Sequence, residues 1–160
     1  MHEAMRQACK TDSEETLYRI ISLDHTADAG YRIEADSREE LVTGSLRALS
    51  DLIGITRENL LNNKLETVSE IIKSNEASDI ETLIAALNDW LYLVQVKNYI
   101  SLDYIVNWTD NLLILECRGI TIENSNTTTT EVKAVTYHNA EILPPDKENN
   151  FWRTTWIVDL

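Results

Sequence analysis

The 160-residue sequence has few of the residues that hold secreted or fibrous proteins together: two cysteines, four glycines and two prolines. Two cysteines cannot build the disulfide framework of a small secreted domain. So little glycine and proline excludes collagen-like and low-complexity chains. No apolar run reaches the roughly 18 residues of a membrane-spanning helix, and the first residues contain no apolar segment of signal-peptide length. We therefore expect a soluble, cytoplasmic protein without membrane contact.

Basic residues are also scarce. Fourteen Lys and Arg stand against 27 Asp and Glu, which gives a formal net charge of −13. Because proteins bind phosphate backbones through clustered Lys and Arg, we expect no strong direct binding of nucleic acid. The acidic surface instead favours cations or a basic protein partner. A chain of this length can bury one core, so we expect a loose leader over residues 1–15 and one domain over 16–160.

The hydrophobic pattern predicts two main helices among about six strands. Each helix begins at a capping box, Ser37-x-x-Glu40 or Ser78-x-x-Glu81, in which side chains satisfy amides of the first turn. Residues 131–138 fit a helical turn as well as a strand. Because helices and strands are grouped rather than alternating, we predict an α+β fold: a single two-layer domain with a mixed or antiparallel sheet packed against the two helices. The predicted strands cover 17–23, 31–36, 66–74, 102–108, 112–122 and 152–160. The strands at 102–108 and 112–122 flank the turn residues Thr109-Asp110-Asn111, which predicts a hairpin.

A polar cluster lies between the first two predicted strands. It contains Asp24, His25 and Asp28 within five residues and ends at Gly30. Two carboxylates and an imidazole could hold a cation or orient a base. A turn is the simpler interpretation on composition alone, because Asp readily caps its own backbone and Gly supplies a positive φ.

The end of the sequence is the second candidate. An apolar strand is followed by Asp159 and Leu160, so an α-carboxylate stands one residue beyond a side-chain carboxylate. Two anionic groups this close favour a cation, Lys or Arg between them. Hard cations such as Ca²⁺ collect oxygens of this kind. An ordinary frayed terminus is the alternative. Spacing alone does not show that Asp28 meets Asp159.

The third candidate is the string from Lys133 to His138, which offers a cation, two hydroxyls and a titratable ring. A half-buried strand with one polar face explains it equally well. The sequence contains no P-loop, G-x-G-x-x-G, G-x-S-x-G, H-E-x-x-H or paired Cys-x-x-Cys motif. Three histidines are too few for a histidine-rich zinc site.

Taken in order, these segments resemble the archease family. The resemblance rests on Asp24–Gly30 (DHTADAG), Leu87–Tyr92 (LNDWLY), Lys133–His138 (KAVTYH) and the final strand ending on Asp159, and it spans roughly residues 17–160. It implies a small cytoplasmic α+β protein that activates the GTP-dependent RNA-splicing ligase of the RtcB type. In that role the protein is not an enzyme. It promotes guanylylation of the ligase, so that the ligase turns over repeatedly in tRNA splicing.

The resemblance also implies site residues. A divalent metal, Ca²⁺ first and Mg²⁺ or Mn²⁺ as alternatives, is expected on Asp28, Asp159 and Leu160. The expected partner surface, or functional support, consists of Asp24, His25, Lys133 and His138.

Two other functions remain open from the residues. One is a small metal-dependent hydrolase that uses Asp28 and Asp159 around a cation, with His25 or His138 as general base. The other is a general acidic chaperone or adaptor for RNA-modification proteins. Neither needs the ligase as a partner.

Overall fold

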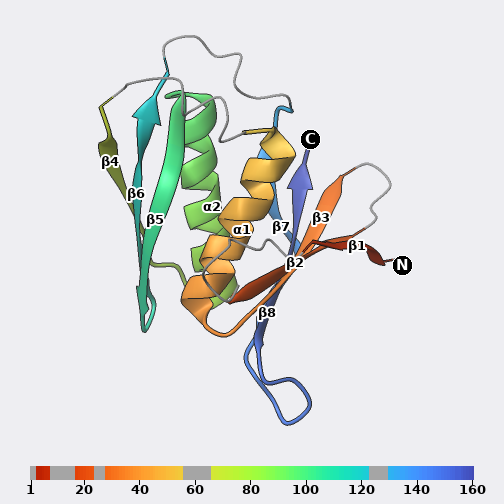
Figure 1. Cartoon of the computed structure of the whole chain (residues 1–160). Coiled ribbons are helices and arrows are strands. Elements are labelled where there is room, and N and C mark those ends of the chain that lie inside the picture. Colours follow the sequence, from red (N-terminus) through yellow and green to blue (C-terminus); the bar gives the residue numbers. More distant parts are fainter. Residues whose placement is uncertain (1–2, 8–16, 24–27, 56–65, 123–129) are drawn as a thin grey trace.

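The computed structural model describes residues 3–7, 17–23, 28–55, 66–122 and 130–160 (Figure 1). These residues form two helices and eight strands. None of the described helices is long and apolar enough to cross a membrane. The elements, in chain order, are β1 (Glu3–Gln7), β2 (Tyr18–Leu23), β3 (Ala29–Ala35), α1 (Arg38–Ile53), β4 (Val68–Ser74), α2 (Asp79–Gln95), β5 (Tyr99–Thr109), β6 (Leu112–Thr121), β7 (Ala134–Leu143) and β8 (Trp152–Asp159).

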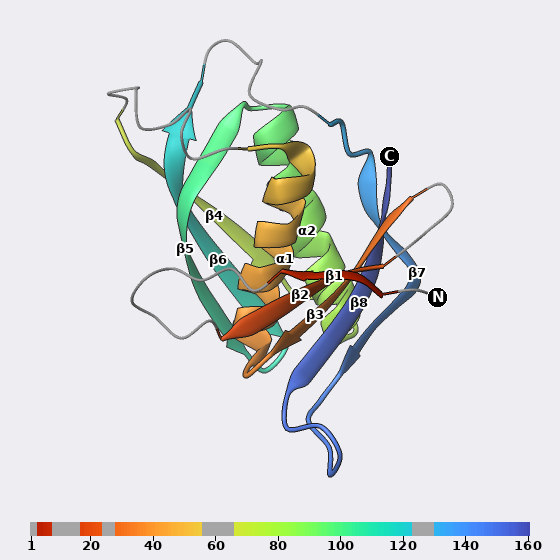
Figure 2. The same cartoon turned by 45° about the vertical axis from the view of Figure 1, so that its right-hand side comes forward.

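The two helices lie between two antiparallel sheets (Figures 1 and 2). One sheet has the order β1-β2-β3-β8-β7 and the other the order β4-β6-β5. Helix α1 packs on β2, β3 and β8 of the first sheet and on β5 of the second, and α2 contacts β7 and all three strands of the second. The predicted α+β class is confirmed. The predicted arrangement, one sheet in a two-layer domain, is wrong, because the strands divide into two sheets that enclose the helices.

The width of the apolar helix faces explains this layering. A helix that is apolar around most of its circumference must be covered on more than one side. Trp90 of α2 is fully buried, and its indole N–H donates to the hydroxyl of Ser101 in β5 at 3.1 Å. On the other side of the helix layer, Trp156 of β8 donates to the hydroxyl of Ser45 in α1 at 3.0 Å. The buried residues of α2 are Thr82, Leu83, Ile84, Ala86, Leu87, Trp90, Leu91, Leu93 and Val94.

Both helix starts are where the capping boxes predict them. The hydroxyl of Ser37 accepts the amide of Glu40 at 3.2 Å, and that of Ser78 accepts the amide of Glu81 at 3.3 Å. Helix α1 ends at Gly54, whose φ of 86° lies in the left-handed region that glycine adopts without strain. The predicted hairpin is also confirmed, with β5 and β6 paired across a turn at Asp110.

Two predictions for the strands need correction or completion. The expected loose leader over residues 1–15 is wrong for Glu3–Gln7, which form β1 and pair with β2. Pairing at a sheet edge depends on backbone hydrogen bonds, so this segment carries no alternating apolar pattern that would have revealed it. The ambiguous segment 131–138 becomes a strand from Ala134 onward.

Cys117 lies in β6 with its thiol buried and free. Burial raises the pKa of this thiol to about 11, so it is almost entirely protonated at neutral pH. A protonated, inaccessible thiol is a poor nucleophile, and Cys117 is therefore a core residue. Cys9 lies outside the described residues.

A single side chain, that of Arg38, ties the start of α1 to both sheets. Its guanidinium lies 4.8 Å from the ring centroid of Trp108 in β5 and 6.0 Å from that of Trp152 in β8. It donates to the backbone oxygens of Trp108 at 3.2 Å and Asp110 at 2.9 Å. It also lies 3.3 Å from the carboxylate of Asp79, the first residue of α2. Arginine can stack its planar guanidinium on a ring and donate several hydrogen bonds in fixed directions at the same time, which lysine cannot do.

We therefore expect Arg38→Lys to lower the free energy of unfolding by about 2 kcal/mol, because lysine keeps the charge but loses the stacking and most of the hydrogen bonds. Urea unfolding followed by tryptophan fluorescence measures this. The matched control is Arg118→Lys, since Arg118 is half exposed and pairs with Glu116 at 3.7 Å. Exposed pairs contribute little, so the control should change stability by less than about 0.5 kcal/mol. Equal effects of both substitutions would contradict the role given to Arg38.

Candidate functional site

The pairing of β3 with β8 brings the start of β3 and the end of the sequence together. These strands run antiparallel, with Ala29 opposite Val158 at one end of the ladder and Ala35 opposite Trp152 at the other. The start of β3 and the end of β8 therefore lie at the same end of the five-stranded sheet. Figure 2 shows the C-terminus beside the strand start.

Asp28 and Asp159 are the residues immediately beyond the first pair of this ladder. Continuing the register by one residue sets them opposite each other, and Leu160 follows directly. Opposite residues of antiparallel strands have Cα atoms about 4.5–5.5 Å apart and side chains on the same face. Asp28 is partly buried and Asp159 is exposed. The backbone thus brings together the three residues predicted as metal ligands, while their binding of a metal stays a prediction.

Lys133 reaches the same end of the sheet from β7. Its backbone N–H donates to the backbone oxygen of Asp159 at 2.8 Å, and the next residue, Ala134, pairs with Asp159 in the β7–β8 ladder. The side chain of Lys133 is exposed. Lys133 therefore joins this end of the sheet through its backbone, while its charged side chain is open to solvent.

His138 lies elsewhere on β7. The ladder pairs Thr136 with Ile157 and then Glu141 with Thr155, so four residues of β7 bulge opposite one residue of β8. His138 is exposed in this bulge, and its Nε2 lies 3.2 Å from the side-chain nitrogen of Asn139. At about 3.3 Å per residue, the bulge is about 10 Å along β8 from Asp159, so the structure does not bring His138 to the carboxylates. Asp24 and His25 lie outside the described residues.

Two residues of α2 hydrogen-bond to the start of β7 and to the residues just before it, and no role was predicted for either. The side-chain amide of Asn88 donates to the backbone oxygen of Val135 at 3.0 Å and accepts its N–H at 2.9 Å. Gln95 does the same with Val132, donating at 2.8 Å and accepting at 2.9 Å. The sequence feature that could have indicated this role is the pair of carboxamide side chains, seven residues apart, at the edge of the apolar face of α2. Asp89, next to Asn88, is exposed.

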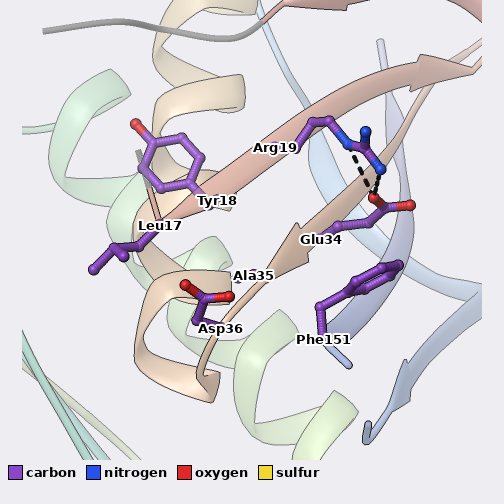
Figure 3. Close-up of a pocket in the computed structure, with 7 residues that line it drawn as sticks. All are labelled: Leu17, Tyr18, Arg19, Glu34, Ala35, Asp36 and Phe151. Carbon is purple, nitrogen blue, oxygen red and sulfur yellow. Dashed lines mark hydrogen bonds and ion pairs between the residues drawn. The ribbon is translucent and has the colours of Figure 1, made fainter. Parts of the chain in front are cut away.

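A surface hollow of about 190 Å³ lies at the opposite end of β3 from Asp28 (Figure 3). Inside it, Arg19 donates through Nε to the carboxylate of Glu34 at 2.9 Å, so these two charges neutralise each other. None of the predicted site residues lines the hollow, which therefore offers no support for the predicted chemistry. Its lining consists of Leu17, Tyr18, Arg19, Glu34, Ala35, Asp36 and Phe151.

The chemistry of the donors at the β3–β8 end fits a hard cation. Side-chain and terminal carboxylates offer only oxygen, which suits Ca²⁺, Mg²⁺ or Mn²⁺ rather than zinc or copper. Within the described ranges, no group of three or more His, Cys, Asp and Glu side chains could hold a metal. The candidate set is smaller than that, since it consists of Asp28, Asp159 and the main-chain carboxylate of Leu160.

Solved structures share this fold. The solution structure of protein 1598 from Methanobacterium thermoautotrophicum matches with a TM-score of 0.62 at 23% identity, covering 91% of this chain and 100% of that one. A crystal structure from Thermotoga maritima, described as an archease and "possible chaperone", matches with a TM-score of 0.57 at 22% identity. It covers 99% of this chain and 100% of that one. At these identities the likeness establishes the fold.

The sequence comparisons carry the assignment further. "Protein archease" of Methanopyrus kandleri is 29% identical over 151 residues, which cover 86% of this chain and 96% of that protein. The model of the archease protein family (MTH1598/TM1083) matches residues 18–160. This match runs from the first residue of β2 to the last residue of the sequence and includes every element except β1. The chain belongs to the archease family.

Proposed function

We propose that this protein is a metal-binding activator of the RtcB-type GTP-dependent RNA-splicing ligase. It acts in the cytoplasm, promotes guanylylation of the ligase, and so sustains its turnover in tRNA splicing, without catalysing a reaction itself. The observation that carries the proposal is the β3–β8 ladder, which sets Asp28 beside Asp159 and Leu160. Membership of the archease family supports it, because ligase activation is what the family resemblance implies.

The proposed metal site uses the carboxylates of Asp28 and Asp159 together with the terminal carboxylate of Leu160. Ca²⁺ suits such a set best, since it accepts flexible coordination by many oxygens, and Mg²⁺ and Mn²⁺ are the alternatives. When bound, the cation supplies a positive centre on an acidic surface, to which anionic groups of a partner can be drawn. Lys133 adds a second positive charge at this end of the sheet. We place Asp24, His25 and His138 on the partner surface.

The position of His138 argues against this residue as the general base of a hydrolase. A general base must come within hydrogen-bonding reach of the water or substrate that it deprotonates. In the described part of the chain, the nearest histidine along β7 is in the bulge, about 10 Å along the strand from Asp159. Among the described residues, no histidine therefore lies close enough to these carboxylates to act as the base of a hydrolytic centre, and the hydrolase alternative keeps only His25, which is outside them.

Net charge supports a basic protein partner. The formal charge of −13 would draw this chain toward the RNA-binding face of a ligase, which must be basic to hold a phosphate backbone. Such attraction speeds encounter and orients the partners more than it strengthens the final complex. The general acidic chaperone shares this property, and the experiments below separate the two.

Binding of Ca²⁺ should stabilise the folded protein. At a free Ca²⁺ concentration one hundred times the dissociation constant, we expect a gain of about 2.7 kcal/mol, measured as a rise in the melting temperature. Asp28→Asn and Asp159→Asn should each remove most of this gain, because each deletes a ligand. The control is Asp110→Asn in the β5–β6 turn, where φ is 51° and asparagine is well tolerated. A Ca²⁺ response that persists in both site variants would contradict the ligand assignment.

Activation should depend on the same carboxylates. We expect the wild-type protein to accelerate covalent guanylylation of the ligase by GTP, and Asp28→Asn or Asp159→Asn to reduce that acceleration at least tenfold. The assay follows transfer of radiolabelled guanylate to the ligase, and Asp110→Asn serves as the control. No acceleration by wild-type protein at equimolar amounts would refute the proposal. Hydrolysis of a phosphoester by the protein alone would favour the hydrolase, and capture of RNA-modification enzymes without the ligase would favour the chaperone.

Ionic strength should weaken the activation. The Debye length falls from about 10 Å at 0.1 M salt to about 3 Å at 1 M, so attraction between the acidic chain and a basic ligase is progressively screened. We expect the concentration of protein needed for half-maximal activation to rise several-fold between about 0.05 and about 0.3 M KCl, because the Debye length falls to about 40% of its starting value over this range. The ligase alone, measured at each salt concentration, is the reference. A constant half-maximal concentration would exclude electrostatic attraction.

A further inference from the structure

The side-chain amides of Asn88 and Gln95 bond to the backbone of residues 132–135 as the peptide groups of a neighbouring strand would. Each side-chain amide gives one donor and one acceptor to a single residue, Val135 or Val132, with all four distances between 2.8 and 3.0 Å. A carboxamide carries the same pair of groups as a peptide unit, so it can satisfy the free edge of a strand. Both valines have buried side chains, which keep the segment against the helix.

The spacing of the two amides matches the spacing of their targets. Seven residues of α-helix advance about 10.5 Å. Three residues of extended chain, from Val132 to Val135, advance about 10 Å. Because the two lengths agree, both amides engage residues 132–135 at once. A slip of the segment by one residue would break all four hydrogen bonds.

This segment is also bonded to the end of β8. The N–H of Lys133 donates to the backbone oxygen of Asp159, and Ala134 pairs with Asp159. The β7–β8 ladder is continuous only from Ala134 to Thr136 at this end, because the bulge interrupts it beyond Thr136. Three pairs beside a bulge fix the register weakly, so α2 supplies the stronger constraint on where the segment meets Asp159.

We propose that Asn88 and Gln95 are positioning residues for the candidate metal site. By fixing residues 132–135 between α2 and β8, they hold Asp159 and Leu160 in place beside Asp28. This inference rests on the proposed metal-binding function. The two amides contact no metal-ligand side chain in this arrangement. They act on the candidate site through the backbone of residues 132–135, which is bonded to Asp159.

The experiment compares Ca²⁺ affinity of the full chain by titration calorimetry in the wild type, Asn88→Ala, Gln95→Ala and the double variant. We expect each single variant to bind Ca²⁺ about tenfold more weakly, since residues that orient metal ligands typically contribute 10–100-fold. Amide hydrogen exchange at Lys133 should accelerate in the same variants. The matched control is Asn107→Ala, because Asn107 is an exposed asparagine of β5 that bonds only locally to Thr109 among the contacts described.

Conservative variants separate positioning from a general loss of structure. Asn88→Asp and Gln95→Glu keep the acceptor for the valine N–H but lose the donor, so they should fold and bind Ca²⁺ with intermediate affinity. Unchanged affinity in these folded variants, with faster exchange at Lys133, would overturn the proposal while leaving the metal site intact. Absence of Ca²⁺ binding by the wild-type protein would overturn both the metal site and its positioning by α2. The wild-type titration is therefore done before any variant is compared.

Discussion

Seven consecutive residue pairs between β3 and β8 hold the strands on which the proposed metal site depends. The ladder joins an early strand to the last one and sets β8 between β3 and β7, inside the larger sheet. Everything proposed about the metal follows from this adjacency, because the two carboxylates come from strands that only tertiary structure can bring together. The family match is consistent with this view, since it covers both strands.

The helices support this arrangement from within. Helix α1 is anchored at its start by Arg38, which links it to a tryptophan of each sheet. Helix α2 is buried around most of its circumference and reaches the segment before β7 through two amides. A helix layer enclosed by two sheets leaves the sheet ends as the places where functional groups can gather. In this protein the proposed metal site lies at the end where β3 starts and β8 stops.

Local signals predicted the helices, their caps and the β5–β6 hairpin, because each depends on residues close in sequence. The Ser37 and Ser78 caps need only the amide three residues on. The division into two sheets was not predictable in this way, since it depends on how widely α2 is covered. The meeting of Asp28 with Asp159 came only from the family resemblance, because spacing carries no information over such a separation. The two α2 amides were missed because a polar residue at the edge of an apolar stripe normally indicates a solvent boundary.

The central place of β8 has a consequence for how the molecule is made. During synthesis, one edge of β3 stays unpaired until β8 has been made. Strand β7 likewise has no partner in its sheet before β8 is present. Long-range pairings of this kind are slow to form and leave strand edges open meanwhile. A cation held between β3 and β8 would therefore bind only after β8 has joined the sheet, so that the proposed metal site would report on correct folding.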